Sequence, residues 1–403
     1  MIRRLLLPAG VSDAALPLLL ARALRAFADG YVAVLLPAYL LALGLGTWQV
    51  GVLATATLFG SALATLAVGA WGHRFHHRRL LLGAALLMAA TGFAFASQSA
   101  FWPLLLIAFV GTLNPSSGDV SVFQPLEQAR LAEAAQGTAR VALFARYSLL
   151  GALFAAVGAL AAAWPELLAQ GLGWDRLEAL RAMFALYGVV GFVVWLLYRR
   201  LPPVAEEMPL PPTPLGPSRG RVLRLAALFS VDSFAGGLLV NALLALWLMQ
   251  RFDMALAAVG VYFFWAGLGT AFSQLLAPLL AQRIGLLNTM VFTHIPASLC
   301  LIAAAFAPSL PLALGLLLLR SLLSQMDVPA RGAFVMAVVT PPERAAAASF
   351  TAVPRSLASA ISPTLGGALL AAGWLAAPLV ACGVLKIAYD LALWRAFRRV
   401  QTH

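Results

Sequence analysis

Hydrophobic residues in this chain come in long runs that are separated by short polar or basic stretches. A helix that crosses a bilayer needs roughly 20 mostly apolar residues. Such runs predict two sets of six spanning helices, at residues 18–44, 48–71, 79–98, 102–125, 141–163 and 182–198, and at 225–249, 256–281, 290–307, 311–339, 346–371 and 376–397. The pattern therefore predicts an all-α polytopic membrane protein with twelve transmembrane helices.

The stretch between the two sets, residues 199–224, has a different character. It holds seven prolines and several arginines and shows no helical period, which is typical of an extended linker. We therefore expect an N-terminal six-helix bundle at 1–198, a linker at 199–224 and a C-terminal six-helix bundle at 225–403.

Composition supports this reading. Of the 403 residues, 62% are hydrophobic and 10% are charged, whereas soluble domains average about 45–50% and about 25%. Cys300 and Cys382 lie in apolar runs and are expected to be packing residues. The histidines at 73, 76 and 77 sit in a basic turn without a nearby cysteine or carboxylate, so we expect neither a metal nor a cofactor.

The formal net charge of +12 follows topology. With both termini placed inside, seventeen arginines fall on inner ends and loops, and only Arg176, Arg181 and Arg251 fall on outer loops. This asymmetry is the positive-inside signal of a membrane protein with cytoplasmic termini and a cytoplasmic linker. The basic charge therefore does not indicate nucleic-acid binding.

Charged residues inside the apolar runs come twice. A charge at the bilayer centre costs roughly 2.5–3.5 kcal/mol on insertion scales, so their positions are informative. Each charged residue of the first half has a counterpart of the same kind in the second half. The pairs are Asp29 with Asp232, 203 positions apart, Asp119 with Asp327, 208 apart, and Arg146 with Arg355, 209 apart. This spacing predicts a duplicated, pseudo-symmetric bundle with a polar path between the halves.

Two loop motifs follow the second and eighth predicted helices. They consist of Gly69, His73, Arg74 and Arg78 in the first copy, and of Gln282, Arg283 and Gly285 in the second. With the 6+6 arrangement, they resemble the cytoplasmic signature of the major facilitator superfamily, roughly G-x-L-A-D-R-x-G-R-R. The chain differs from it at His73 and Gln282, where the family has an acidic residue that pairs across the cytoplasmic gate. His73 offers a pH-sensitive alternative, because both forms of histidine are accessible near pH 7.

The fourth predicted helix holds a polar segment with a proline at each end. Prolines interrupt the helical hydrogen-bond ladder, and irregular backbone at membrane depth must face protein or a cavity. Asp119 is therefore expected to point into the bundle. Arg146 on the fifth helix is its natural partner, or that of Glu127, which we expect to be a structural ion-pair residue near the membrane edge.

The tenth predicted helix contains Asp327 and Arg331 at i, i+4, a spacing that favours an ion pair. Pro329 is expected to interrupt this helix. The eleventh helix carries a polar stripe that most simply lines a water-filled path or faces a polar neighbour; it consists of Thr351, Arg355, Ser359 and Ser362. Arg355 is its candidate for contacting an anionic substrate or Asp327.

Polar residues on four other helices complete the candidates. Asn241 continues the line of Asp232 along the seventh helix. Lys386 and Asp390 at i, i+4 are expected to pair with each other, and His294 is expected to be a packing residue because no acidic neighbour is near it in sequence. On the first helix, Arg22 and Arg25 can reach the cytoplasmic face, whereas Asp29 lies deeper.

The resemblance implies a secondary transporter that moves a small-molecule substrate by alternating access of two bundles. Buried carboxylates are the usual proton carriers in such bundles. We therefore expect proton coupling, first through Asp119 and Asp327 and then through Asp29 and Asp232, with the buried arginines stabilising their ionised forms. Aromatic residues on the eighth helix favour export of an organic compound by antiport, and the paired buried arginines favour uptake of an organic anion.

Two other classes of function are weighed against transport. A membrane sensor usually carries an appended soluble domain, and a membrane enzyme needs a nucleophile with a base or a set of metal ligands. Neither is evident, and a nucleotide-binding loop of the type G-x-x-x-x-G-K-[ST] is missing. We expect a monomeric protein of the bacterial inner membrane that is not an enzyme.

Overall fold

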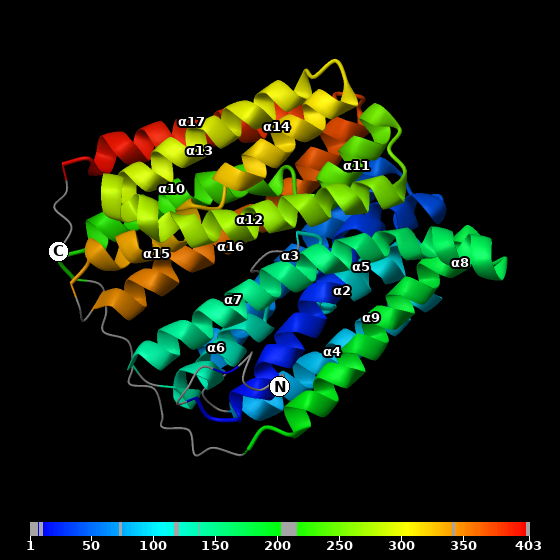
Figure 1. Cartoon of the computed structure of the whole chain (residues 1–403), viewed down its shortest axis with the longest axis horizontal. Helices are drawn as coiled ribbons and strands as arrows, with labels where there is room; N and C mark the ends of the chain where they lie inside the picture. Colours follow the sequence, from blue (N-terminus) through cyan, green and yellow to red (C-terminus); the bar gives the residue numbers. More distant parts are fainter. Residues whose placement is uncertain are drawn as a thin grey trace. The chain divides into compact units, whose positions relative to one another are not determined.

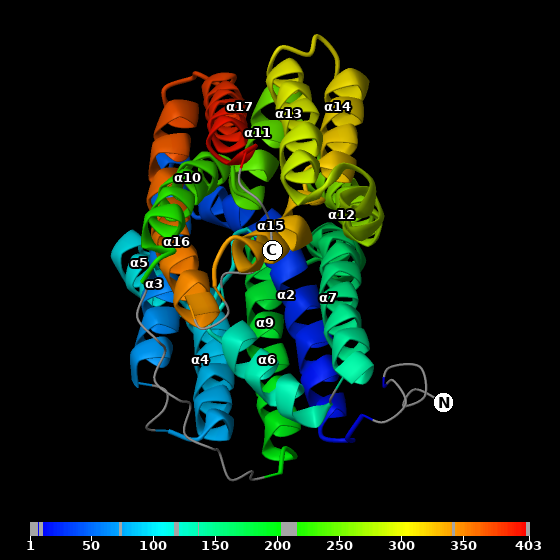
Figure 2. The ribbon, with the colours of Figure 1, turned by 90° about the vertical axis from the view of Figure 1, so that its left-hand side faces the viewer.

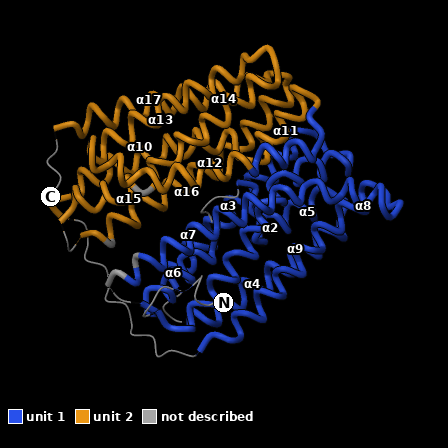
Figure 3. The backbone as a smooth tube through the Cα atoms, in the orientation of Figure 1, with its two compact units in different colours: residues 1–209, 254–264 blue, residues 210–253, 265–403 orange. Residues whose placement is uncertain are grey.

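The computed structural model describes residues 7, 11–71, 75–116, 121–135, 137–202, 216–340 and 343–399. These residues form helices, with no strand among them. Two compact units result, with residues 1–209 and 254–264 in unit 1 and residues 210–253 and 265–403 in unit 2 (Figure 3). The expected all-α membrane fold is confirmed.

Eight helical segments within the described residues are long and apolar enough to cross a bilayer. They are Thr47–Gly69, His77–Ser97, Ala142–Leu172, Arg176–Arg199, Arg219–Phe252, Leu256–Ile284, Leu286–Ala305 and Ala377–Phe397. Phe101–Val110 and Leu310–Leu323 are shorter apolar helices. The expected total of twelve spans stays a prediction.

Four helices of the first half pack against one another in sequence-distant pairs. Their bounds are α2 Ala15–Ala42, α3 Thr47–Trp71, α4 His77–Ser97, α5 Phe101–Val110, α6 Phe123–Ala134, α7 Gly137–Leu160, α8 Trp164–Leu172 and α9 Arg176–Arg199. Helix α2 packs against α7 and α9, and α4 packs against α9 (Figure 2).

The second half repeats this order. Its helices are α10 Arg219–Gly237, α11 Asn241–Phe252, α12 Leu256–Ile284, α13 Leu286–Ala305, α14 Leu310–Leu323, α15 Asp327–Ala337, α16 Arg344–Ala371 and α17 Ala377–Phe397 (Figure 1). Helix α10 packs against α16 and α17, as α2 packs against α7 and α9, and α13 packs against α17 as α4 packs against α9.

Two glycines show how closely the repeated helices approach. A Cβ atom at Gly158 on α7 would overlap the backbone carbonyl of Phe27 on α2. A Cβ atom at Gly366 on α16 would overlap the carbonyl of Leu238, which follows α10. The two glycines are 208 residues apart (366 − 158), and both permit the close backbone contact that small residues give to membrane helices.

Three predicted spans are divided in the structure. The fourth ends as a helix at Val110, and α6 begins at Phe123, in line with the expected interruption. The tenth is interrupted at 324–326, so the expectation that Pro329 breaks it was wrong. Pro329 lies in the first turn of α15, where a proline removes no intrahelical hydrogen bond.

The division of the seventh span between α10 and α11 was not predicted. Residues 238–240 separate the two helices. Gly236 and Gly237 precede this break, and glycine costs a helix about 1 kcal/mol relative to alanine. Asn241 therefore begins α11 instead of continuing the polar line of α10.

Candidate functional site

Unit 1 buries one ion pair between two helices. The guanidinium of Arg25 on α2 pairs with the Glu127 carboxylate on α6, and their side chains are 2% and 0% exposed. Tyr147 on α7 donates to Oε2 of Glu127 at 2.6 Å, and Tyr198 on α9 donates to Oε1 at 2.6 Å. Both carboxylate oxygens are therefore satisfied, as a buried charge requires.

Aromatic rings cover the cations of this cluster. The Arg25 guanidinium lies 4.1 Å from the ring centroid of Phe123, and that of Arg22 lies 5.1 Å from the ring of Tyr147. Cation–π contacts of this kind stabilise a desolvated guanidinium. Glu127 forms a buried ion pair as expected, and its partner in that pair is Arg25. Arg25 therefore does not extend to the cytoplasmic face.

Unit 2 buries a larger charged cluster, which we call the acidic cluster and which consists of Asp232, His294, Asp327, Arg331, Lys386 and Asp390. Asp232 on α10 accepts from the Lys386 ammonium at 2.7 Å and lies 3.3 Å from the Arg331 guanidinium. Arg331 also pairs with Asp327 one turn earlier on α15, as the i, i+4 spacing predicted.

His294 on α13 lies between two carboxylates. Its Nδ1 atom is 3.0 Å from Oδ2 of Asp390 on α17, and its Nε2 atom is 3.8 Å from Oδ1 of Asp232. Lys386 Nζ lies 3.3 Å from the same Nε2 atom. His294 is buried with both nitrogens in contact with polar groups, and folding brings to it acidic groups that lie 62 and 96 residues away in sequence (294 − 232, 390 − 294).

The expected pair between Lys386 and Asp390 was also wrong. Lys386 donates to Asp232 and Asp390 pairs with His294. The i, i+4 rule finds neighbours on one helix surface, but a buried side chain also meets groups of other helices. Lys386 is the only lysine among the 27 basic residues of the chain, and its place in an apolar run was the signal that could have marked this site.

The charges of the acidic cluster do not balance. Among these six residues, three carboxylates outnumber the guanidinium of Arg331 and the ammonium of Lys386 by one while His294 is neutral. The side chains of its acids are 0–5% exposed, against 12% for Arg331 and 13% for Lys386. A buried net charge is costly, so one added positive charge would stabilise this site.

Several predicted site residues fall elsewhere. Asp119, His73 and Arg74 lie outside the described residues. Asp29, Arg146 and Arg355 are half-buried on α2, α7 and α16.

The polar stripe on α16 is partly closed to water. Thr351 and Ser362 are 6% and 0% exposed. The hydroxyls of Thr351 and Ser359 donate to carbonyls of their own helix. At Thr351 and Ser362 the stripe therefore faces protein, and its role along a solute path stays a prediction.

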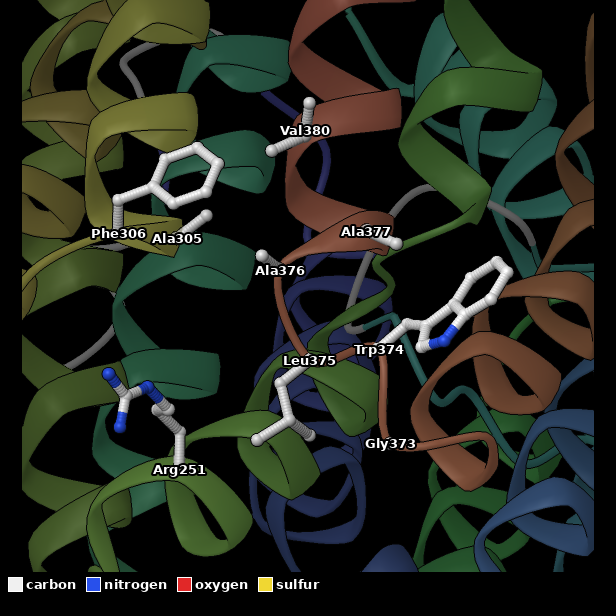
Figure 4. A pocket seen from close by; sticks show the side chains of 9 residues that line it. All are labelled: Arg251, Ala305, Phe306, Gly373, Trp374, Leu375, Ala376, Ala377 and Val380. Carbon is white, nitrogen blue, oxygen red and sulfur yellow. The ribbon is translucent and has the colours of Figure 1, made fainter.

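A separate cavity of about 610 Å³ opens at one end of unit 2. It is lined by the connections after α11, α13 and α16, with Arg251, Phe306 and Trp374 among the lining side chains (Figure 4). These connections lie at the opposite helix ends from the start of α10 and α16, and no member of the acidic cluster lines the cavity.

The sequence matches the family model described as Major Facilitator Superfamily over residues 18–231 and 225–403. The chain belongs to the major facilitator superfamily. This family consists of membrane transporters, so the protein is an integral, multi-pass membrane transporter.

Relatives support the same family. The chain is 23% identical over 406 residues to an uncharacterized membrane protein of Saccharomyces cerevisiae, YJR124C, and the match covers 92% of this chain and 91% of that protein. Its fold is similar to the nucleoside transporter NupG (TM-score 0.72, 14% identity, 97% and 100% of the two chains covered). It is also similar to a D-xylose-proton symporter (TM-score 0.71, 15% identity, 94% and 97% covered).

The residues of the superfamily loop signature differ in their contacts and exposure between its two copies. In the first, Arg78 on α4 donates to the carbonyl of Arg199 at the end of α9, at 2.8 Å, and Gly69 is exposed near the end of α3. In the second, Gln282 and Arg283 are exposed at the end of α12. Gly285 has a φ of +86°, a left-handed conformation that favours glycine.

Proposed function

We propose that this protein is a proton-coupled secondary transporter of a small organic solute, and that the acidic cluster of unit 2 couples the proton to transport. The supporting observation is the excess of one carboxylate over the fixed cations in a buried site. A proton taken up there removes the net charge, and a neutral site costs less to move between two membrane-facing states.

Two of the predicted carboxylates, Asp232 and Asp327, belong to this cluster. We propose that Asp29, Asp119, Arg146 and Arg355 contribute to the solute path through the membrane. The two bundles, 1–198 and 225–403, would alternate about this path, as in other transporters with repeated halves.

Export by proton exchange is the direction that we propose first. Trp265 and Phe272 on α12 are 57% and 56% exposed, so this helix presents aromatic surface to an organic solute or to lipid. Uptake of an organic anion with a proton is the second candidate. It is favoured by the greater exposure of Arg331 and Lys386 in the acidic cluster, since an anion approaching the cluster meets its cations first.

Proton flux in proteoliposomes tests both directions. Purified protein is first screened by thermal stability against organic anions, organic cations, sugars and nucleosides, because a ligand of the folded state raises the melting temperature. Each stabilising compound is then added outside vesicles that contain a pH-sensitive dye. Cotransport acidifies the interior and exchange makes it more alkaline, whereas no change of internal pH with any transported compound contradicts proton coupling.

Neutralising variants test the cluster itself. Asp327→Asn and Asp232→Asn are expected to lose solute-driven proton flux. Glu133→Gln is the matched control, since Glu133 is an exposed carboxylate that pairs with Arg130 outside the acidic cluster. If both aspartate variants move protons like the parent, the acidic cluster does not couple the proton.

We also propose the bacterial inner membrane as the location, with both termini in the cytoplasm. The arginine asymmetry of the loops supports this orientation. A cysteine at position 98, in the connection between α4 and α5, would then react with a membrane-impermeant reagent added to whole cells, and one at position 282 would not.

A further inference from the structure

The two nitrogens of His294 have different partners, which defines its resting state. Asp390 as a carboxylate can only accept, so Nδ1 carries the hydrogen and donates to it at 3.0 Å. The Lys386 ammonium can only donate, so Nε2 accepts from it at 3.3 Å. The imidazole is therefore neutral in this arrangement, with both nitrogens satisfied.

We propose that the coupling proton binds to Nε2 of His294 and not to an aspartate. In this step, the hydrogen bond that Asp232 accepts from Lys386 is replaced by one that it accepts from His294. The inference rests on the proposed proton coupling of the same cluster. A new N–H bond forms at Nε2 as an O–H bond of a hydronium ion breaks and leaves a water molecule.

The geometry supplies the reason for the transfer. An Nε2–H group and an ammonium are both donors, so they cannot remain hydrogen-bonded across the present 3.3 Å. Asp232 Oδ1 is the acceptor that they share, at 3.8 Å from Nε2 and 2.7 Å from Nζ. Protonation therefore directs His294 towards Asp232 and repels Lys386.

Lys386 has room for this movement. Its side chain is 13% exposed, whereas that of Asp232 is 5% exposed. Gly236 on α10 has no side chain, and a Cβ atom there would lie 3.8 Å from Nζ. The ammonium can therefore leave Nε2 without displacing a neighbouring side chain of α10, and it then offers a free donor to an anionic group.

The helices that pack against α13 are α14, α15 and α17. Their charged and titratable groups around the acidic cluster are Arg320 on α14, Asp327 and Arg331 on α15, and Cys382, Lys386, Tyr389 and Asp390 on α17, and Asp232 on α10 joins them. Of these, only Asp232, Lys386 and Asp390 lie within 4 Å of the imidazole nitrogens in the described contacts. Asp232 is paired with Lys386 and Arg331, and Asp390 with His294 Nδ1, so the Nε2 lone pair that now faces the Lys386 ammonium is the site for the added proton.

The decisive experiment needs no transported solute. Full-length protein labelled with 13C-histidine is placed in lipid nanodiscs and titrated by NMR. Histidine changes charge between about pH 5 and 8. Among the signals of the five histidines, we expect one pH-dependent signal that is lost in His294→Gln and kept in His76→Gln, which removes an exposed histidine. A His294 signal that stays neutral over this range overturns the proposal.

Two further variants test the assigned partners. Asp390→Asn removes the carboxylate behind Nδ1 and is expected to move the midpoint of the His294 titration to lower pH. Lys386→Met removes the competing cation and is expected to move it in the opposite direction. Midpoints that do not move in opposite directions contradict the assigned geometry.

Flux measurements separate this inference from the proposed function. If the parent protein shows no solute-driven proton flux, the proposed coupling fails, and the NMR titration still judges the protonation site. If the parent is coupled and His294→Gln remains equally coupled, His294 is not the coupling site although the function stands. Coupling that is lost in His294→Gln, with solute exchange retained, supports the proposal.

Discussion

The two charged clusters occupy equivalent helices but have opposite arrangements of charge. In unit 1, the cation Arg25 lies on α2 and the acid Glu127 is the fifth residue of α6. In unit 2, the acid Asp232 lies on α10 and the cation Arg331 is the fifth residue of α15. Each arginine also lies near an aromatic ring, that of Phe123 or Phe229.

The surroundings of these exchanged pairs differ. Glu127 is completed by two tyrosine hydroxyls, which add hydrogen bonds without charge. Asp232 contacts Lys386, His294 and Arg331. Arg331 also binds a second carboxylate, that of Asp327. One copy of the repeated helix contact is therefore an ion pair completed by hydroxyls, whereas the other is a network in which a lysine, a histidine and an arginine share Asp232.

The largest expected effect is a difference in unfolding free energy between variants of the two clusters. Glu127→Gln leaves the buried Arg25 without a counter-charge, and breaking a buried pair costs about 3–5 kcal/mol of unfolding free energy. Asp390→Asn should cost less than about 1 kcal/mol, because it removes the excess negative charge of its cluster. Chemical denaturation in detergent measures both, and equal losses would contradict the proposed difference between the clusters.

A smaller effect is expected where the two halves are alike. Gly158→Ala and Gly366→Ala each force a methyl group against a backbone carbonyl, and overpacking of this kind costs about 1–3 kcal/mol. Gly69→Ala is the control, because nothing lies within 4 Å of the added atom. Melting temperatures that fall for one glycine of the pair and not for the other would show that the close approach is not repeated.

Removing both partners of the unit 1 pair sharpens the comparison further. Arg25→Met combined with Glu127→Gln removes both charges, and buried pairs replaced in this way are often neutral in stability. We expect the double variant to recover most of the loss seen in Glu127→Gln, to within about 1 kcal/mol of the parent. A double variant as unstable as the single one would show that the tyrosine contacts, not the charges, hold the helices.

The smallest effect concerns a carboxylate outside the membrane-spanning segments. Hydrogen bonds from Ser218 and Thr340, with the backbone of Gly216, lower the pKa of Glu343 from 4.5 to about 2. Its contribution to stability is therefore complete above about pH 4.5 and is lost as the pH falls through about 2. Glu343→Gln should lower the melting temperature at pH 6 and make no difference near pH 2, whereas a difference independent of pH would contradict this account.

Sequence periodicity predicted contacts along a helix better than contacts between helices. The pair of Asp327 and Arg331 lies on one helix surface and followed from its spacing. Arg25 and Glu127 are 102 residues apart, and no local pattern relates them. The same holds for His294, whose partners come from α10 and α17.

Helix interruptions show a similar limit. The break in the tenth span was expected at its proline, but prolines are compatible with a first helical turn, and the chain resumes its helix at Asp327. The break after Gly237 lies where the carbonyl of Leu238 packs against Gly366 of α16, a contact that the sequence does not display. Apolar run length therefore located the helices but not the positions at which they divide.

The single lysine of the chain has a practical consequence. An amine-reactive reagent has only one side chain to modify in this protein, and that side chain lies within the acidic cluster. The rate at which Lys386 is acylated in native membranes would therefore report how often its amine leaves Asp232 and His294. Chemical footprinting of the unmodified protein can follow this site without any introduced label.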